Sequence, residues 1–130
     1  MSHFSEIKTQ FTSLFYLRKA LDKLKLFYKL EGDLENLSNA QENNINIIIP
    51  QSNNYPIKFC RNQSNEKYRF LFDENFWEQS DSIPSFLNKI TQQYATEVII
   101  GESQQVGFEP IEYQKNKNGS ATIKIIRYKK

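Results

Sequence analysis

The chain has 130 residues, a length typical of one domain, and its 38% hydrophobic and 14% aromatic residues are enough to bury a core. This composition excludes a disordered tail and makes a multidomain protein unexpected. Seventeen basic residues against fifteen acidic ones leave a formal charge of +2, too small a surplus to indicate nucleic-acid or membrane binding by itself.

Signals for export and membrane insertion are missing from the sequence. Cys60 is the only cysteine, so no internal disulfide can form. The N-terminus lacks a basic region followed by an apolar one, and apolar runs such as 47–49 and 98–100 are far shorter than the roughly 20 residues of a spanning helix. We therefore expect a reduced, unexported protein without a membrane span. The abundance of Ile, Asn and Lys beside few Ala is the bias of an AT-rich gene.

The chain begins with a strand and a helix. Apolar and polar residues alternate over 4–11, which predicts a strand with one solvated face. Thr12 or Ser13 can then cap a helix whose apolar residues recur at three- and four-residue spacing from Leu14 to Tyr28. The opposite, mostly basic face of this helix is interpreted as solvent-facing; it carries Arg18, Asp22, Lys25 and Lys29.

A loop and three strands follow. Residues 31–44 are polar, and their apolar residues follow neither the helical nor the strand period, so they predict a loop. Strands are predicted over 45–50, 55–61 and 67–73, and the short connections between them indicate an antiparallel meander. One face of the last strand is strongly apolar, with Tyr68, Phe70 and Phe72.

The last third of the chain predicts a long helix and a hairpin. The helix begins around Ser80 to Pro84 and ends at Gly107, and its buried residues are predicted to be Phe86, Leu87, Ile90, Tyr94 and Val98. Strands over 108–113 and 121–128 are joined through an Asn-Gly turn, the strongest short hairpin signal. The element order predicts an α+β fold, with an antiparallel sheet of about five to six strands, two helices packed on one face, and a single domain over 1–130.

Groups that could catalyse a reaction are scarce. Cys60 and His3 are the only thiol and imidazole; Cys60 lies in a strand pattern, where a small buried thiol is the ordinary interpretation. The four glycines form no phosphate-binding loop. The carboxylates between Asp73 and Asp81 lack the spacing of a calcium loop and are interpreted as a solvated connection; they are Asp73, Glu74, Glu78 and Asp81. We expect no cofactor, no metal and no catalytic residue.

Two groups of residues are candidates for contact with a macromolecule. The C-terminal hairpin gathers basic and aromatic residues that could bind nucleic acid or a protein, namely Lys115, Lys117, Lys124, Arg127 and Tyr128. Such lysines also protect a sheet edge against aggregation. Phe76 and Trp77 could anchor a partner, or the tryptophan could close one end of the sheet. The aromatic strand 67–72 is weakly similar to an RNA-binding platform but lacks its glycines.

Segments at both ends of the chain resemble one known family. They are Met1-Ser2-His3-Phe4-Ser5 with Ile7-Lys8-Thr9, Gln93-Tyr94-Ala95, Gly107-Phe108, and Gly119 with Thr122-Ile123-Lys124 and Arg127. The chain is similar over nearly its whole length to the hypothetical chloroplast reading-frame thirty-five family of algal plastids and cyanobacteria, and departs from it at 54–59, where the family is richer in glycine. The resemblance implies a plastid-encoded protein of the stroma or the stromal membrane surface. It implies no activity and supplies no catalytic residues.

These observations lead to three hypotheses. The leading one is a non-catalytic accessory or interaction protein of the plastid stroma, which presents its antiparallel sheet and loops to a protein partner. The first alternative is RNA or DNA binding through the basic C-terminal hairpin, which requires affinity that falls steeply with salt. The second is an enzyme with a dispersed polar site, which requires a deep pocket with converging titratable groups.

Overall fold

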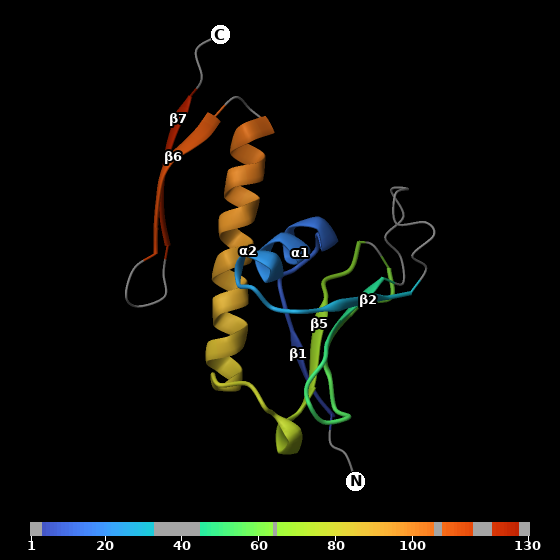
Figure 1. Cartoon of the computed structure of the whole chain (residues 1–130). Helices are drawn as coiled ribbons and strands as arrows, with labels where there is room; N and C mark the ends of the chain where they lie inside the picture. Colours follow the sequence, from blue (N-terminus) through green and yellow to red (C-terminus); the bar gives the residue numbers. More distant parts are fainter. Residues whose placement is uncertain (1–3, 33–44, 64, 106–107, 116–120, 128–130) are drawn as a thin grey trace.

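The computed structural model in Figure 1 describes residues 4–32, 45–63, 65–105, 108–115 and 121–127, the last two ranges by their backbone. Its elements in chain order are β1 (Phe4–Lys8), α1 (Leu14–Lys23), β2 (Lys29–Glu31), β3 (Asn46–Ile49), β4 (Ile57–Cys60), β5 (Arg69–Asp73), the short 3-10 helix η2 (Glu74–Phe76), α2 (Ile83–Gln105), β6 (Phe108–Lys115) and β7 (Ala121–Arg127). The predicted α+β fold is confirmed.

Five strands form one antiparallel sheet in the order β1-β5-β4-β3-β2. The predicted meander of β3, β4 and β5 is therefore confirmed. Its register aligns one apolar residue from every strand in a continuous row, Ile7, Phe70, Phe59, Ile47 and Leu30. Since side chains alternate between the two faces of a sheet, this row defines the inner face.

The core lies between this inner face and both helices. α1 contributes Leu14, Leu17 and Leu21, and α2 contributes Phe86 and Ile90, to the same buried cluster as the inner strand residues. Figure 1 shows both helices on one side of the sheet, as expected. The face of the sheet opposite the helices is called the outer face below.

The start of α1 is held by side chains from two elements. Ser13 is the N-cap, and its hydroxyl accepts a hydrogen bond from the Tyr16 backbone N–H at 3.2 Å, as the sequence predicted. Tyr94 of α2 reaches the same turn, where its hydroxyl accepts from the backbone N–H groups of Thr12 at 3.1 Å and Ser13 at 3.0 Å. The two helices are thus joined at this end by hydrogen bonds as well as by packing.

The expectation that the first helix continues to Tyr28 is wrong, because the chain reverses after Lys23. The backbone N–H of Lys25 bonds to the carbonyl of Asp22, and that of Leu26 bonds to Leu21, each at 3.0 Å. This is a Schellman cap with Lys25 in the left-handed conformation, at φ 58°, where most helices have glycine. The reversal frees residues 29–31 to form β2, a strand that the sequence did not predict.

The last predicted elements are also confirmed. α2 runs to Gln105, near the expected stop at Gly107, which lies outside the described residues. β6 and β7 pair as an antiparallel hairpin with a bulge between Pro110 and Glu112, and they form a sheet of their own that contacts α2. Residues 33–44, most of the predicted loop, lie outside the described ranges. None of the described helices is long and apolar enough to cross a membrane.

Candidate functional site

The outer face of the sheet is one candidate surface. Its side chains alternate with the core residues along every strand; they are Phe4, Glu6 and Lys8 of β1, Lys29 and Glu31 of β2, Asn46 and Ile48 of β3, Lys58 and Cys60 of β4, and Arg69 and Leu71 of β5. Both described helices pack on the other face. This face is therefore not covered by either helix.

Apolar residues lie at the centre of the outer face and charged residues surround them. Ile48 and Leu71 are half-buried and belong to one cross-sheet row with Lys29, Lys58 and Glu6. Four basic residues share the face with two exposed acidic ones; they are Lys8, Lys29, Lys58 and Arg69 against Glu6 and Glu31, whereas Asp73 at the end of β5 is buried. Arg69 and Glu6 form an ion pair of 3.7 Å with side chains 37% and 43% exposed, so its contribution to stability is small. The face as a whole carries a basic excess.

Cys60 lies on the outer face and is half-buried. Burial raises the pKa of its thiol above 9.0, a change that nearby Lys58 and Arg69 oppose and Glu31 reinforces. A reactive cysteine needs a lowered pKa, because the thiolate is the nucleophile. The thiol is therefore protonated at neutral pH, and its candidate partner His3 lies outside the described residues.

The candidate anchors Phe76 and Trp77 are both half-buried, and each has aromatic neighbours. Phe76 stacks on Tyr55 with ring centroids 3.7 Å apart. Trp77 packs edge-on against Phe86 at 5.1 Å and Phe72 at 5.9 Å, and its indole N–H donates to the Asp81 carbonyl at 2.8 Å. Trp77 thus closes one end of the core, and contact of either ring with a partner stays a prediction.

The basic residues of the hairpin are only partly placed. Lys115 pairs with Ala121 at the turn end, Lys124 pairs with Glu112, and Arg127 pairs with Phe108 at the other end. Lys117 and Tyr128 lie outside the described residues. The register therefore distributes the three placed residues along the whole hairpin, and nucleic-acid contact by them stays a prediction.

The carboxylates between Asp73 and Asp81 have separate structural partners. Asp73 is only 3% exposed, contrary to the expectation of a solvated connection, because it caps η2 by accepting from the Asn75 N–H. Glu78 accepts from the backbone of Ser52, and Asp81 pairs with Lys89 at 2.8 Å. Within the described ranges, no three His, Cys, Asp or Glu residues are grouped as metal ligands.

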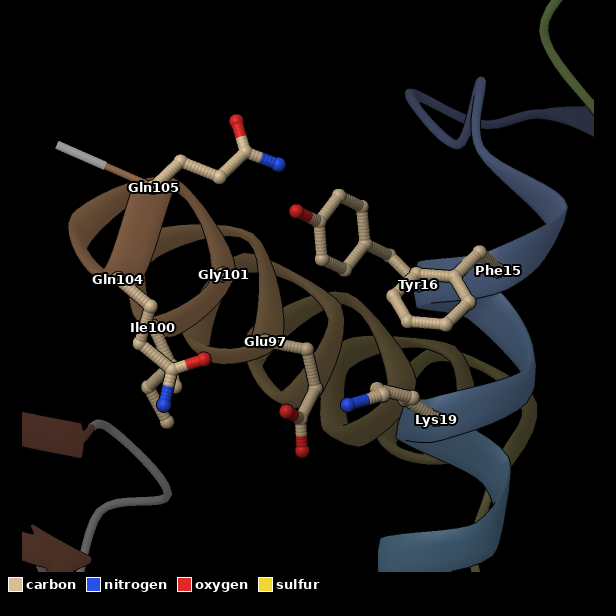
Figure 2. A pocket seen from close by; sticks show the side chains of 8 residues that line it. All are labelled: Phe15, Tyr16, Lys19, Glu97, Ile100, Gly101, Gln104 and Gln105. Carbon is tan, nitrogen blue, oxygen red and sulfur yellow. The ribbon is translucent and has the colours of Figure 1, made fainter.

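A pocket of about 330 Å³ opens between α1 and α2, on the helical side of the sheet. Figure 2 shows the side chains that line it: Phe15, Tyr16 and Lys19 of α1, and Glu97, Ile100, Gly101, Gln104 and Gln105 of α2. Lys19 and Glu97 point toward one another from the facing helices. Gly101 leaves room for the Tyr16 ring in this pocket, since a Cβ at position 101 would lie 2.7 Å from Cε1 of that ring.

Sequence reasoning missed this pocket because its walls come from helices far apart in the chain. The one local signal was Gly101, an isolated glycine inside a helical pattern, which often marks the close approach of another group. The weak similarity of strand 67–72 to an RNA-binding platform is wrong on geometry. Tyr68, Phe70 and Phe72 are at most 3% exposed and face the core, so they cannot stack on bases.

Comparison with known proteins places the chain in a family. A family model described as a protein of unknown function, DUF1257, matches residues 20–124. The chain is 50% identical over 123 residues to the uncharacterized protein ycf35 of Trieres chinensis, covering 94% of each protein. It is 35% identical over 129 residues to ycf35 of Guillardia theta and 32% identical over 131 residues to ycf35 of Cyanophora paradoxa, covering 99% of each protein in both cases.

No solved structure matches the chain. The ycf35 relatives are encoded in plastids, which supports a plastid location for this protein. The family model covers most of the chain, and the relatives match nearly all of it. The chain therefore belongs to the ycf35 family, as its terminal segments indicated.

Proposed function

We propose that this protein is a non-catalytic accessory protein of the plastid stroma that binds a protein partner through the outer face of its sheet. The observation that carries the proposal is the outer face, which neither described helix covers, with half-buried Ile48 and Leu71 at its centre and exposed or half-buried charges around them. Protein interfaces commonly have this arrangement, in which an apolar centre lies within a polar rim.

The charges of the outer face indicate the chemistry of the partner. Four basic residues against two acidic ones favour a partner surface with an excess of Asp and Glu around an apolar patch. An antiparallel sheet can leave one face in water, but that face then consists of polar residues alternating with the core. Leu71 and Ile48 depart from this alternation, which is what a buried contact would explain.

A protein partner fits this face better than a nucleic acid. Single-stranded nucleic acid binds where bases stack on exposed aromatic rings. The described outer face has one aromatic residue, Phe4, which is 57% exposed at the edge strand, while the rings of β5 face the core.

The experiment is affinity purification of the tagged protein from plastids, at low and moderate salt. The test variant is Lys58→Glu with Arg69→Glu, which reverses two charges of the outer face. The matched control is Lys23→Glu with Lys25→Glu, which makes the same change of charge on exposed residues at the end of α1. A second test variant, Lys8→Glu with Lys29→Glu, changes only exposed residues of the two edge strands, where folding is least at risk.

We expect one stoichiometric protein with the wild type and the control, and at least about tenfold less of it with each test variant. Equal recovery with all folded variants would refute the outer face as the binding surface. Recovery of transcripts in place of a protein would refute the proposal and support the basic hairpin.

A further inference from the structure

The pocket between α1 and α2 carries one buried negative charge. Glu97 is only 5% exposed, yet it lines the pocket. One carboxylate oxygen accepts from the Gln93 side-chain amide at a long 3.3 Å, and within the described residues the carboxylate makes no ion pair. A buried carboxylate is costly unless charged or polar donors surround it. A donor group supplied by a ligand would meet that requirement.

Lys19 of α1 places a positive charge on the pocket wall that faces Glu97. The ammonium of Lys19 lies 4.9 Å from the centroid of the Phe15 ring and points toward Glu97 in Figure 2. Its side chain is exposed, and in the part of the chain that the structure describes it forms no ion pair with Glu97. Two opposite charges thus border the same space without neutralising each other directly.

The two charges together select the ligand. A simple cation would be attracted by Glu97 and repelled by Lys19, and a simple anion would experience the reverse. A molecule that carries an ammonium and a carboxylate satisfies both walls at once. The pocket volume of about 330 Å³ is at the small end of the range for ligand sites.

The remaining lining suits such a molecule. Phe15 and Ile100 offer apolar surface, while Tyr16 and the amides of Gln104 and Gln105 offer hydrogen-bonding groups around the opening. We propose that the α1–α2 pocket binds a small zwitterion of the free α-amino acid class, with its ammonium at Glu97 and its carboxylate at Lys19. This site is on the helical side of the sheet, so it is separate from the outer face and from the function proposed for it.

The test uses three probes of nearly equal size that differ in charge. L-Leucine carries both charges, L-leucinamide lacks the carboxylate, and 4-methylpentanoate lacks the ammonium. Calorimetric or NMR titration of the full chain should show saturable binding of leucine, at least about tenfold tighter than that of either analogue. Absence of saturable leucine binding up to about 10 mM, or equal binding of one analogue, would overturn the proposal.

Variants locate the binding. Glu97→Gln keeps the side-chain shape but removes its charge, and Lys19→Met keeps most of the apolar stem of an exposed residue. Each should weaken leucine binding at least about tenfold, since each removes one of the two charged contacts. Lys23→Met, on the same helix but outside the pocket, is the matched control and should bind as the wild type does. If Glu97→Gln fails to fold, Lys19→Met decides, and wild-type affinity in that variant would refute the site.

Discussion

The hydroxyl of Tyr94 makes a specific contribution to stability that a single oxygen deletion can measure. It accepts two backbone hydrogen bonds from the start of α1, at 3.1 Å from Thr12 and 3.0 Å from Ser13. Tyr94→Phe removes the acceptor of both hydrogen bonds but leaves the ring packed on Phe11, whose centroid is 4.8 Å away. Water can replace the bond to exposed Thr12 more easily than the bond to half-buried Ser13, so we expect a loss of about 1–2 kcal/mol.

The assay is urea unfolding followed by the fluorescence of Trp77 and by circular dichroism. A loss of this size lowers the midpoint without changing the slope, and lowers the melting temperature by about 3–6 °C for a domain of this length. Tyr28→Phe is the control, because that hydroxyl accepts a single longer bond of 3.3 Å from Arg18 and should cost about 0.5 kcal/mol or less. Equal stability of Tyr94→Phe and wild type, or an equal loss in the control, would refute the reasoning.

Four further predictions concern Lys25, Arg61, Cys60 and Gly101. Lys25→Gly should raise the free energy of unfolding by up to about 1 kcal/mol, because glycine adopts φ 58° without strain; a lower melting temperature would contradict this. Arg61→Lys should cost about 2–3 kcal/mol in urea unfolding, because the 2%-exposed guanidinium donates to backbone oxygens and stacks on an aromatic ring. The raised pKa of Cys60 predicts slower alkylation by iodoacetamide in the folded protein than in urea at pH 8. Because the folded protein has the higher Cys60 pKa, the contribution of this thiol to the free energy of unfolding is complete below the ordinary thiol pKa and is lost as the pH rises through the folded pKa. A free energy of unfolding that increases above pH 9.0 would contradict this expectation. Gly101→Ala should displace the Tyr16 ring, shift its NMR resonances and abolish leucine binding, while the better helix propensity of alanine, about 1 kcal/mol, offsets part of the lost packing.

The strands of the meander could be predicted because one face of each is buried. Residues 45–50, 55–61 and 67–73 place apolar side chains at every second position, although Ile48 and Leu71 add apolar residues on the other face, and the structure places β3, β4 and β5 within these ranges. The pairing of β1 with β5 could not be predicted in the same way, since nothing local in either strand identifies a partner that is far away in the chain.

The end of α1 shows a different limit. Apolar residues continue at helical spacing through Leu24 and Tyr28, so the pattern predicts a longer helix. The helix nevertheless ends at Lys23. The sequence does not predict this end, because Lys25 occupies the left-handed position at which the usual signal is glycine. A non-glycine residue there costs about 1 kcal/mol, and Leu26 and Tyr28, packed against the core beyond the reversal, offset that cost.

The candidate sites were predictable only in part. The outer face follows from the alternation of the strands, once both helices are placed on one side. The pocket depends on Glu97 and Lys19 being brought together by the crossing of two helices, and each residue alone resembles an ordinary surface charge. The hairpin was predictable from its Asn-Gly turn, but its independence from the main sheet was not.

The position of β1 has a consequence for how the protein reaches its native state. Among the described strands, β1 pairs with β5 alone, and α1, β2, β3 and β4 all lie between them in the chain. On the ribosome, β1 emerges before the other described strands, and none of these can pair with it until β5 has been translated, at roughly 5–20 residues per second. A pairing between residues so far apart in the chain raises the contact order, which slows folding. A nascent chain halted before β5 would therefore expose an unpaired strand, and chaperone dependence should be greatest at that stage of synthesis.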